Sequence, residues 1–572
     1  MKQENLFSVS ILRKRLLAIL LSITFLFCII FGRFFAIQVV EEKRLGYRAT
    51  DQWTREIPVV AERGKITDRN GTVLAGNNLS YSIFVRRNAV ENREEVIKTL
   101  SSLFSLDENE LSSKFDKKVS EFKAVKNVSK EEVLKLEAYA LKGVYYSPDN
   151  TRFYPYESLL CQVLGFTSSD MTGVSGIEKE YDKYLKGKNG EILYETDLVG
   201  IDVGDNILYK EGEAGLDIAL TVDYKIQTLC ERVMAEAVAQ YSPKGAECLV
   251  LDLDSFEILA MASLPSYDLN DVPREDSALL SALSRNGIVS NSYEPGSTFK
   301  VITAAADIEE HLRGNPKAFS TSYVFPASRT RSVDGTTVKC WSDHSNGKHS
   351  HQTLKEALNN SCNPCFTDIA LSLGTDCFYS YLSKFGFGGV TGIDFPGEAL
   401  GMLLPASAVR GCDLARIGFG QTIAVTAIQL ACAVGAAVNG GNYYVPHLVK
   451  KIGSKEIEKE LKSNPISEKT SEILRGMLEG VVSEGSGKKA YIEGYRIGGK
   501  TGTAQKYENG RLALGKYVSS FVGFYPADAP KYLTLVIIDE PQGAYYGSVV
   551  AAPCAREIFR GIIAIEEGKE VV

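Results

Sequence analysis

Two residues of this chain, Ser297 and Lys300, have the S-x-x-K spacing of a serine nucleophile and its base. Pro295 and Gly296 break the chain just before an apolar run. We therefore expect Ser297 at a helix N-terminus, where free N–H groups and the helix dipole favour developing negative charge. Lys300 follows one turn later on the same face. Burial and a second cation nearby would lower the pKa of this amine and allow it to accept the serine proton.

Two further segments could complete such a site. Ser361 and Asn363 form an S-x-N triplet, whose hydroxyl and amide can relay a proton to a leaving group and hold a substrate backbone. The segment Lys500-Thr501-Gly502-Thr503 is predicted to lie on a strand edge. There the lysine supplies positive charge, the threonine hydroxyls can bind a substrate carboxylate, and the glycine lets a ligand backbone come close.

Each segment also has a plain structural explanation. Ser297 could cap a helix, the S-x-N triplet could be an ordinary turn, and Lys500 could lie solvated on an edge strand. The stretch Gly494–Thr501 also fits G-x-x-x-x-G-K-[ST], the pattern of a phosphate-binding P-loop. Such a loop must follow a buried strand and open a helix, whereas residues 503–511 are predicted to end a strand and turn. We therefore reject the P-loop interpretation.

The second half of the chain is predicted to supply the elements that position these residues. Asp223 is expected to cap a helix, and the apolar segments 423–438 and 551–565 are expected to form a buried helix and a closing helix. The predicted fold is an antiparallel sheet flanked by helices, and not a doubly wound parallel sheet. The expected strands span residues 247–253, 257–263, 491–503, 517–525 and 532–538, and the helix that follows Ser297 spans 298–312.

The first half has no obvious pairing of a nucleophile with a base, and we expect an extended, non-catalytic α+β module. Residues 63–75 indicate two strands joined by an Asn-Gly turn. Residues 90–137 are charged and helical in period, with Ser129 as a helix cap, and residues 173–190 are typical of a loop-and-helix connector. The predicted organisation is a cytoplasmic tail at 1–15, a transmembrane anchor at 16–40, a pedestal domain at 41–220 and a catalytic domain at 221–572.

The N-terminal segment predicts a membrane anchor with most of the chain outside the cell, and the composition argues against some classes of function. The segment Leu16–Val40 is strongly apolar and follows Arg13, Lys14 and Arg15, so it can span a bilayer with the positive cluster in the cytoplasm. The alternative, a cleaved signal peptide, lacks a small-x-small site after the apolar run. The net charge of −7 and the lack of a basic stripe argue against nucleic-acid binding. Five histidines leave few residues for a histidine-based mechanism.

The three motifs together carry a resemblance, because they occur in the order S-x-x-K, S-x-N, K-T-G and each has a suitable predicted context. The sequence resembles the class B penicillin-binding proteins, the membrane-anchored D,D-transpeptidases of bacterial peptidoglycan synthesis. It is more similar to the division and sporulation members than to the elongation type. The resemblance covers nearly the whole chain and includes residues 63–75, 152–155, 173–178, 220–223, 260–268, 418–429 and 439–441.

This resemblance implies catalytic roles. Ser297 would attack the carbonyl between the two terminal D-alanines of a stem peptide, with Lys300 as the base. The backbone N–H groups of Ser297 and Thr503 would form the oxyanion hole. Ser361 and Lys500 would pass a proton to the departing D-alanine. An amine from a neighbouring strand would then take the acyl group and form the cross-link.

The resemblance also implies binding residues and partners. Asn363 would hold the substrate amide, and Thr501, Gly502 and Thr503 would bind the terminal carboxylate region. β-Lactams mimic the D-Ala-D-Ala end and should acylate Ser297. The implied partners are peptidoglycan stem peptides, β-lactams, the membrane, a membrane glycosyltransferase, and division or sporulation proteins. No cofactor and no nucleic acid are expected.

Three alternatives for the function stay open at this point. A D,D-carboxypeptidase or β-lactamase-like hydrolase would need an efficient route for water to the acyl-enzyme. A β-lactam sensor should carry several membrane spans, and only one is predicted here. A non-catalytic β-lactam-binding scaffold would not need the complete set of motifs.

The cysteine and histidine residues near the second motif suggest two hypotheses. Cys340, His344, His349 and His351 resemble a zinc cluster, but their spacing is not a standard one, so we expect a loop and no metal site. Cys362 lies inside the S-x-N triplet, outside the membrane, where a disulfide with Cys340 could form and displace the triplet. The alternative is a pair of buried thiols.

Overall fold

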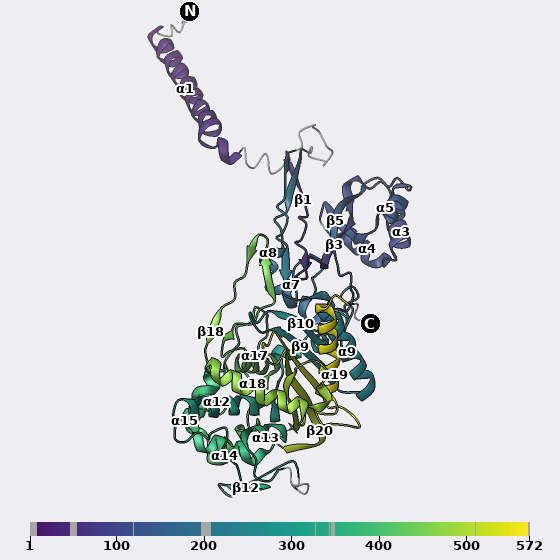
Figure 1. The fold of residues 1–572 in the computed structure, drawn as a ribbon. Helices are drawn as coiled ribbons and strands as arrows, with labels where there is room; N and C mark the ends of the chain where they lie inside the picture. The colour runs from purple at the N-terminus through teal and green to yellow at the C-terminus, as the bar shows by residue number, and fades with distance from the viewer. Residues whose placement is uncertain are drawn as a thin grey trace, which may run out of the picture. The chain divides into compact units, whose positions relative to one another are not determined.

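The computed structural model describes two compact units, which are treated separately below (Figure 1). Unit 1 comprises Met1–Ala61, Leu79–Asp149 and Lys188–Glu213, and unit 2 comprises Glu62–Asn78, Asn150–Gly187 and Ala214–Val572. Part of the predicted cytoplasmic tail, Asp343 of the predicted loop and the turn at 509–510 lie outside the described residues. The described residues are 9–45, 54–117, 119–195, 208–326, 328–342, 344, 349–508 and 511–569.

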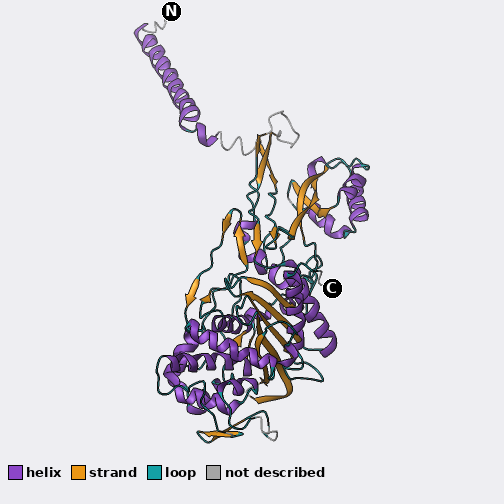
Figure 2. Ribbon diagram, viewed as in Figure 1, coloured by secondary structure: helices purple, strands orange, loops and turns teal. Residues whose placement is uncertain are grey.

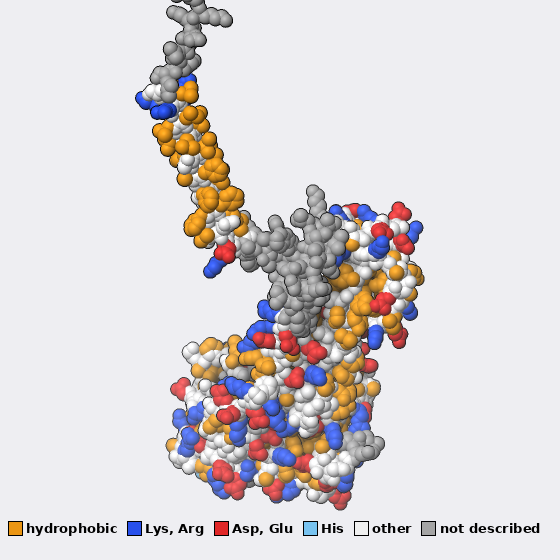
Figure 3. Space-filling view, turned by 90° about the horizontal axis from the view of Figure 1, so that it is seen from above, with side chains coloured by type: hydrophobic (Ala, Val, Ile, Leu, Met, Phe, Trp, Pro, Cys, Tyr) orange, Lys and Arg blue, Asp and Glu red, His pale blue; other side chains and the backbone are white. Residues whose placement is uncertain are grey.

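Helix α1 (Val9–Phe35) and the short π-helix η1 (Ala36–Val40) form the predicted anchor. The segment Ser10–Val40 is long enough to cross a bilayer, and its most apolar stretch has a mean hydropathy of 2.4. Its side chains are hydrophobic around the helix and exposed, with Lys and Arg at its start (Figure 3). A helix that is apolar on all sides and not buried by protein is suited to lipid, which fits a single-pass membrane anchor.

The rest of unit 1 contains a small α+β core. Helices α3 (Arg93–Phe104), α4 (Glu108–Asp116) and α5 (Lys130–Glu137) pack with β4 (Glu121–Val128) and the end of β3 (Val73–Arg86) around residues such as Leu100. Ser129 caps α5 in a capping box, as predicted. The remaining strands of unit 1 are β1 (Thr54–Val59), β6 (Gly190–Glu195) and β7 (Leu208–Lys210), which form a three-stranded sheet, and β5 (Val144–Phe153), which pairs with β3.

The prediction of helix for residues 90–137 is wrong in its middle. Residues 121–128 form strand β4, which pairs antiparallel with β3 so that Phe122 lies opposite Val85 and Val128 opposite Tyr81. The charged residues of this segment recur with a helical period. Its buried residues Ala124 and Val128, however, fill the part of the core that the helices do not cover. Tertiary packing therefore overrides the local pattern here.

The central sheet of unit 2 has five antiparallel strands in the order β10-β9-β21-β20-β19 (Figure 2). This confirms the predicted antiparallel sheet. The strand that carries Lys500 begins at Gly498, seven residues later than predicted, because residues 488–490 form a 3-10 turn and Ile492 and Tyr495 only a single bridge. The five strands are β9 (Gly245–Asp252), β10 (Ile258–Leu264), β19 (Gly498–Glu508), β20 (Arg511–Tyr525) and β21 (Tyr532–Asp539).

Both faces of this sheet are buried. Along β21, Val536 and Ile538 pack into one core with α9 (Tyr224–Tyr241) and α19 (Ala551–Glu566), whereas Leu533, Leu535 and Ile537 pack into the other core, with α17 (Ala427–Val438). Asp223 caps α9 through the backbone N–H groups of Lys225 and Ile226, as predicted. Each such buried aliphatic side chain contributes about 1.5–3 kcal/mol to folding. The sheet is therefore a rigid support for its edge strand, β19.

Helix α12 (Lys300–Leu312) lies at the centre of a helical layer (Figure 1). Its residues from Lys300 to Glu309 are all buried, which is more than an amphipathic stripe would give. The helices packed against it are α14 (Asn363–Leu373), α15 (Thr375–Lys384), α17 and α18 (Glu468–Ser483), and the short helices α13 (Leu354–Asn359) and α16 (Gly411–Ile417) complete the layer.

Two stretches assigned by sequence to the pedestal, 62–78 and 150–187, pack within unit 2. Glu178 holds them together: its fully buried carboxylate accepts hydrogen bonds from Arg63 Nε at 2.7 Å and Arg152 Nε at 2.6 Å. Breaking such a buried pair by removing one partner is strongly destabilising. The sequence boundary at residue 220 stays a prediction.

Candidate active site

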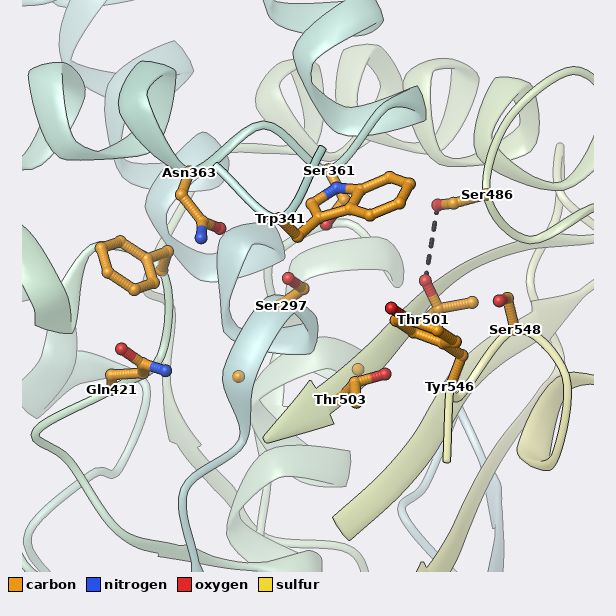
Figure 4. Close-up of a pocket in the computed structure, with 13 residues that line it drawn as sticks. Ser297, Trp341, Ser361, Asn363, Gln421, Ser486, Thr501, Thr503, Tyr546 and Ser548 are labelled. Carbon is orange, nitrogen blue, oxygen red and sulfur yellow. Dashed lines mark hydrogen bonds between the residues drawn. The ribbon is translucent and has the colours of Figure 1, made fainter. Parts of the chain in front are cut away.

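Ser297 lies on a tight 3-10 turn, η3 (Gly296–Phe299), that leads directly into α12. This differs from the predicted position at the N-terminus of an α-helix. Gly296 has φ +55°, and a Cβ there would lie 3.1 Å from the Thr503 carbonyl oxygen. The close approach to β19 therefore shapes the turn, which Thr298 Oγ1 supports by donating to the Pro295 carbonyl at 2.7 Å. Ser297 consequently faces the space between β19 and the S-x-N turn (Figure 4).

Lys300 is fully buried and joins the first motif to the second. Its Nζ donates hydrogen bonds to the Ser361 carbonyl oxygen at 2.8 Å, to Ser361 Oγ at 3.1 Å and to Asn363 Oδ1 at 2.8 Å. Among the described residues, no carboxylate lies within ion-pair distance of this ammonium. Burial therefore dominates, and it lowers the pKa of Lys300 from 10.5 to about 8. A lysine in this state can exchange a proton near neutral pH.

The S-x-N turn connects α13 to α14. Ser361 adopts a left-handed conformation, with φ +55°, which is uncommon for a residue other than glycine. Pro364 is the second residue of α14 and favours the start of a helix just after this reversal. Asn363 donates from Nδ2 to the Lys339 carbonyl at 3.0 Å, which leaves its side-chain oxygen for Lys300. The strained turn thus presents both triplet side chains to one buried ammonium.

Lys500 is the second fully buried lysine, on the edge strand β19. Its Nζ makes only long hydrogen bonds, 3.3 Å to the Thr501 carbonyl and 3.5 Å to Thr501 Oγ1. Burial and the charge of Lys300 together hold its pKa well below the ordinary value. On the same strand, Thr501 Oγ1 donates to Ser486 Oγ at 3.4 Å, and Thr503 Oγ1 accepts from the Gly547 backbone N–H at 2.9 Å.

Gly502 has a packing reason to be glycine. A Cβ at this position would lie 2.4 Å from Ser520 Oγ and 3.0 Å from the Pro295 carbonyl oxygen. The missing side chain therefore lets β19 approach both β20 and the turn that carries Ser297. The predicted role of Gly502 in admitting a ligand backbone stays a prediction.

A cavity of about 300 Å³ lies over Ser297 (Figure 4). Six of the predicted residues line it, whereas Lys300 and Lys500 lie buried behind its walls. The predicted lining residues are Ser297, Ser361, Asn363, Thr501, Gly502 and Thr503, and the residues that the sequence analysis did not single out are Gly296, Trp341, Phe419, Gln421, Ser486, Tyr546 and Ser548. Of these, Gly296 had a signal as the chain break just before Ser297, and Phe419 and Gln421 lie in the matched stretch 418–429. The others come from loops whose position depends on the fold.

The loop after β13 (Thr336–Lys339) contributes a second group of reactive side chains, here named the Cys–His cluster: Cys340, His344, His349 and Cys362. Their sulfur and ring-nitrogen atoms all lie within 4.8 Å of one another. Sequence grouped His351 with this set, but His351 is exposed outside it, and Cys362 of the S-x-N turn takes its place. Burial lowers the pKa of His349 to about 4, so this ring is neutral at physiological pH.

A serine that lines a cavity close to two buried lysines, on a turn between an antiparallel sheet and a helical layer, is the arrangement expected of a serine acyl-transfer enzyme. Residues 247–560 match the family model for the penicillin-binding protein transpeptidase domain, and residues 58–220 match the model for the penicillin-binding protein dimerisation domain. The chain belongs to the class B penicillin-binding proteins.

The similarity to known proteins extends along nearly the full length of this chain. The chain is 40% identical to "Stage V sporulation protein D" of Bacillus subtilis over 560 residues, which cover 96% of this chain and 85% of that protein. It is 28% identical to the "Peptidoglycan D,D-transpeptidase FtsI" of Escherichia coli, covering 95% and 90%. The crystal structure of a peptidoglycan synthetase from Bifidobacterium adolescentis is similar, with a TM-score of 0.72, 26% identity and coverage of 91% and 98%.

Proposed function

We propose that this chain is a peptidoglycan D,D-transpeptidase that forms an acyl-enzyme on Ser297 and that β-lactams acylate the same residue. The observation that carries the proposal is the buried Lys300. It is bonded to both polar members of the S-x-N turn, and it lies one turn along the chain from a serine that lines the cavity.

In the acylation step, Lys300 accepts the proton of Ser297 as the serine oxygen attacks the carbonyl of the penultimate D-alanine. The pKa of about 8 supports this role, because a useful fraction of the amine is neutral at physiological pH. The oxygen of the tetrahedral intermediate is then bound by the backbone N–H groups of Ser297 and Thr503. The short distance between the turn and β19, fixed by Gly296 and Gly502, supports this pairing of donors.

Departure of the terminal D-alanine needs a proton. Ser361 Oγ, at 3.1 Å from Lys300 Nζ, is placed to pass one from the protonated lysine to the leaving amine. Lys500 supplies positive charge from behind β19, and Thr501 and Thr503 offer hydroxyl groups to the terminal carboxylate. Asn363 holds the substrate amide on the opposite wall of the cavity.

An amine, rather than water, completes the reaction. Among the described residues that line the cavity there is no carboxylate and no imidazole to activate a water molecule. This supports a long-lived acyl-enzyme that waits for the amine of a second strand, and it disfavours a β-lactamase-like hydrolase. An incoming amine loses its proton through the same lysine and forms the peptide cross-link.

The anchor supports a membrane-bound enzyme with its N-terminus in the cytoplasm and its catalytic unit outside. Arg13, Lys14 and Arg15 lie near the start of α1, just before its apolar run, and such positive clusters stay on the cytoplasmic side. The inferred partners are a membrane glycosyltransferase, which supplies the strands to be cross-linked, and proteins of the division or sporulation machinery.

The test is intact-protein mass spectrometry after treatment with penicillin. The wild-type chain should gain the mass of one penicilloyl group, and Ser297→Ala should gain none. An adduct that survives Ser297→Ala would overturn the assignment of the nucleophile. Absence of an adduct on folded wild-type protein would overturn the proposed function.

A further inference from the structure

The Cys–His cluster has the dimensions of a tetrahedral metal site. Cys340 Sγ lies 3.8 Å from Cys362 Sγ and 3.7 Å from His349 Nδ1. With Zn–S bonds of about 2.3 Å and Zn–N bonds of about 2.0–2.1 Å, the edges of a tetrahedron are about 3.8 Å between two sulfurs and about 3.6 Å between sulfur and nitrogen. Both measured separations match these edges, and the other separations among the four donor atoms are at most 4.8 Å, so small shifts of the side chains would seat an ion at the centre.

An independent observation concerns His344. Both of its ring nitrogens are shielded from solvent and have no hydrogen-bond partner among the described residues. Buried polar atoms are normally paired, and an unpaired imidazole is costly. The ring stacks on His349 with centroids 4.7 Å apart, which keeps its nitrogens at the cluster. A metal ion would give this ring the partner that it lacks.

The donor set favours one class of ion. Two thiolates and two imidazoles in a tetrahedral arrangement are the usual ligands of structural zinc, whereas calcium and magnesium prefer oxygen ligands. Four protein ligands leave no open position for a substrate, so the ion would have a structural role. On binding, Zn²⁺ displaces one proton from each thiol, and the two protons pass to solvent.

We propose that the Cys–His cluster binds one Zn²⁺ ion and that this ion fixes the wall of the catalytic cavity that carries the S-x-N turn. The binding site does not depend on the function proposed above, but the effect on acylation does.

The position of the cluster explains this effect. Cys362 lies between Ser361 and Asn363, the two residues that bind Lys300. On the other side, Cys340 lies between Lys339, whose carbonyl accepts from Asn363, and Trp341, which lines the cavity. Coordination would tie the two segments together at the point where both meet the catalytic lysine, because metal ligands from different segments restrict each other.

The metal site and the disulfide suggested by the sequence exclude each other. At 3.8 Å the two sulfurs are not bonded, whereas a disulfide requires about 2.05 Å. Zinc needs both thiolates, so a bound ion protects Cys340 and Cys362 from pairing. The proposal therefore assigns these two residues a reduced, metal-bound state in the active enzyme, while the disulfide stays a prediction for oxidised protein.

The experiment measures metal in the full-length chain. The protein is purified in detergent without chelators, carries a tag free of histidine and cysteine, and is analysed by elemental mass spectrometry. We expect about one zinc per chain in the wild type and less than about a tenth of that in Cys340→Ser/Cys362→Ser. His344→Ala should lower the zinc content as well. The matched controls Cys365→Ser and His351→Ala, which change a neighbouring buried thiol and an exposed histidine outside the cluster, should keep it.

Cobalt gives a second readout that does not depend on activity. Co²⁺ exchanged into the wild type should show the visible bands of a tetrahedral ion and thiolate charge-transfer bands in the near ultraviolet, and both should be absent in Cys340→Ser/Cys362→Ser. Wild-type protein without zinc, or with zinc that survives the removal of both cysteines, would overturn the site. A Cys340–Cys362 disulfide in freshly purified active protein, seen as a mass lower by two hydrogen atoms, would also overturn it.

The effect on catalysis is tested by labelling with fluorescent penicillin. Removal of zinc should slow labelling by about tenfold to a hundredfold, since small displacements of positioned groups have effects of this size, and added zinc should restore the rate. Ser297→Ala should keep its zinc and lose all labelling, so the two proposals can fail separately. Unchanged labelling of zinc-free protein would overturn the role of the ion at the cavity wall.

Discussion

The two walls of the catalytic cavity are held in place by different means. The sheet wall, Thr501 to Thr503 on β19, is fixed by a backbone ladder to β20 that runs from Gly498 opposite Phe524 to Glu508 opposite Arg511. The helical wall, Ser361 to Asn363 on the S-x-N turn, has no such ladder. Its backbone makes two local hydrogen bonds, from the Ser361 N–H to the Leu358 carbonyl at 3.1 Å and from the Cys362 N–H to the Ala357 carbonyl at 3.0 Å. Its other support comes from side chains, chiefly the three hydrogen bonds that Lys300 donates.

Because of this difference, we expect the two walls to be sensitive to different substitutions. A ladder of backbone hydrogen bonds tolerates changes of side chain but not the insertion of atoms between closely packed strands. A turn held by side chains tolerates no loss of the groups that hold it, because buried acceptors would be left without partners. The same contrast separates the two buried lysines, since Lys300 makes three hydrogen bonds of 2.8–3.1 Å and Lys500 only two, of 3.3 and 3.5 Å.

The largest expected effect is that of Lys300→Met on the helical wall. Methionine has a similar length but offers no base, so the rate of penicillin acylation should fall by about 10²–10⁴-fold, the usual contribution of general base catalysis. Stopped-flow measurements or timed labelling with fluorescent penicillin give this rate. A variant that retains more than a tenth of the wild-type rate would show that another group takes the serine proton.

Lys500→Met is the variant whose free energy of unfolding is compared with that of Lys300→Met. Lys300→Met leaves the oxygens of Ser361 and Asn363 without their donor, whereas Lys500→Met removes only long, weak hydrogen bonds. Urea unfolding should therefore show Lys300→Met to be the less stable of the two by about 1–3 kcal/mol. Equal stabilities would contradict the contrast between a side-chain-held and a backbone-held wall.

The pH dependence of acylation is expected to follow Lys300. Only its neutral form can accept a proton, and burial lowers its pKa from 10.5 to about 8. The rate should rise about tenfold per pH unit up to pH 8 and level off above it, so pH 6 should be about a hundredfold slower than the plateau. The charged and titratable groups around it are Lys500, the imidazole of His349 and the thiols of Cys340, Cys362 and Cys365. A rate that still rises at pH 10 would mean that burial does not lower this pKa.

The two walls also differ in how far sequence could predict them. Ser297 and Lys300 are three residues apart and Ser361 and Asn363 are two apart, so a linear pattern was sufficient to select them. Trp341, Tyr546 and Ser548 reach the cavity only through long loops, and no local pattern places a loop of that kind. The sequence analysis weighed Cys340, His344, His349 and His351 as a zinc cluster and rejected it because their spacing is not standard. Cys362 belongs to another motif, and its short distance to Cys340 exists only in the folded chain.

The fold shows the same limits. The nearly continuous apolar run of β21 and the Asp223 cap of α9 are local signals, and both predictions are confirmed. Strand β4 was predicted as helix because its charged residues obscure the pattern of its buried residues. The start of β19 was misplaced because Tyr491 and Ile492 are apolar but do not lie in a strand. In both cases the neighbour in space, not the neighbour in sequence, determines the backbone.

Gly502→Ala tests the sheet wall. The added methyl group would lie 2.4 Å from Ser520 Oγ, so β19 must move away from β20 or from the turn that carries Ser297. We expect a loss of stability of about 1–3 kcal/mol in urea unfolding, the usual cost of overpacking. The matched control is Gly476→Ala on the exposed face of α18, where nothing lies within 4 Å, and it should stabilise the protein by about 0.5–1 kcal/mol. The two substitutions must change the free energy of unfolding in opposite directions. Changes in the same direction would reject this account of the packing.

The smallest effect is expected for Ser486→Ala, which removes the side chain that accepts from Thr501 Oγ1 at 3.4 Å. If the ladder alone orients Thr501, this long hydrogen bond adds about 0.5 kcal/mol, and acylation should change by less than about threefold. The measurement is the same labelling rate, with Trp341→Phe as a second lining variant for comparison. A loss of more than tenfold in the labelling rate of Ser486→Ala would mean that the sheet wall, like the helical wall, depends on its side chains. Only in that case could the removal of one weak acceptor displace the Thr501 hydroxyl that binds the substrate carboxylate.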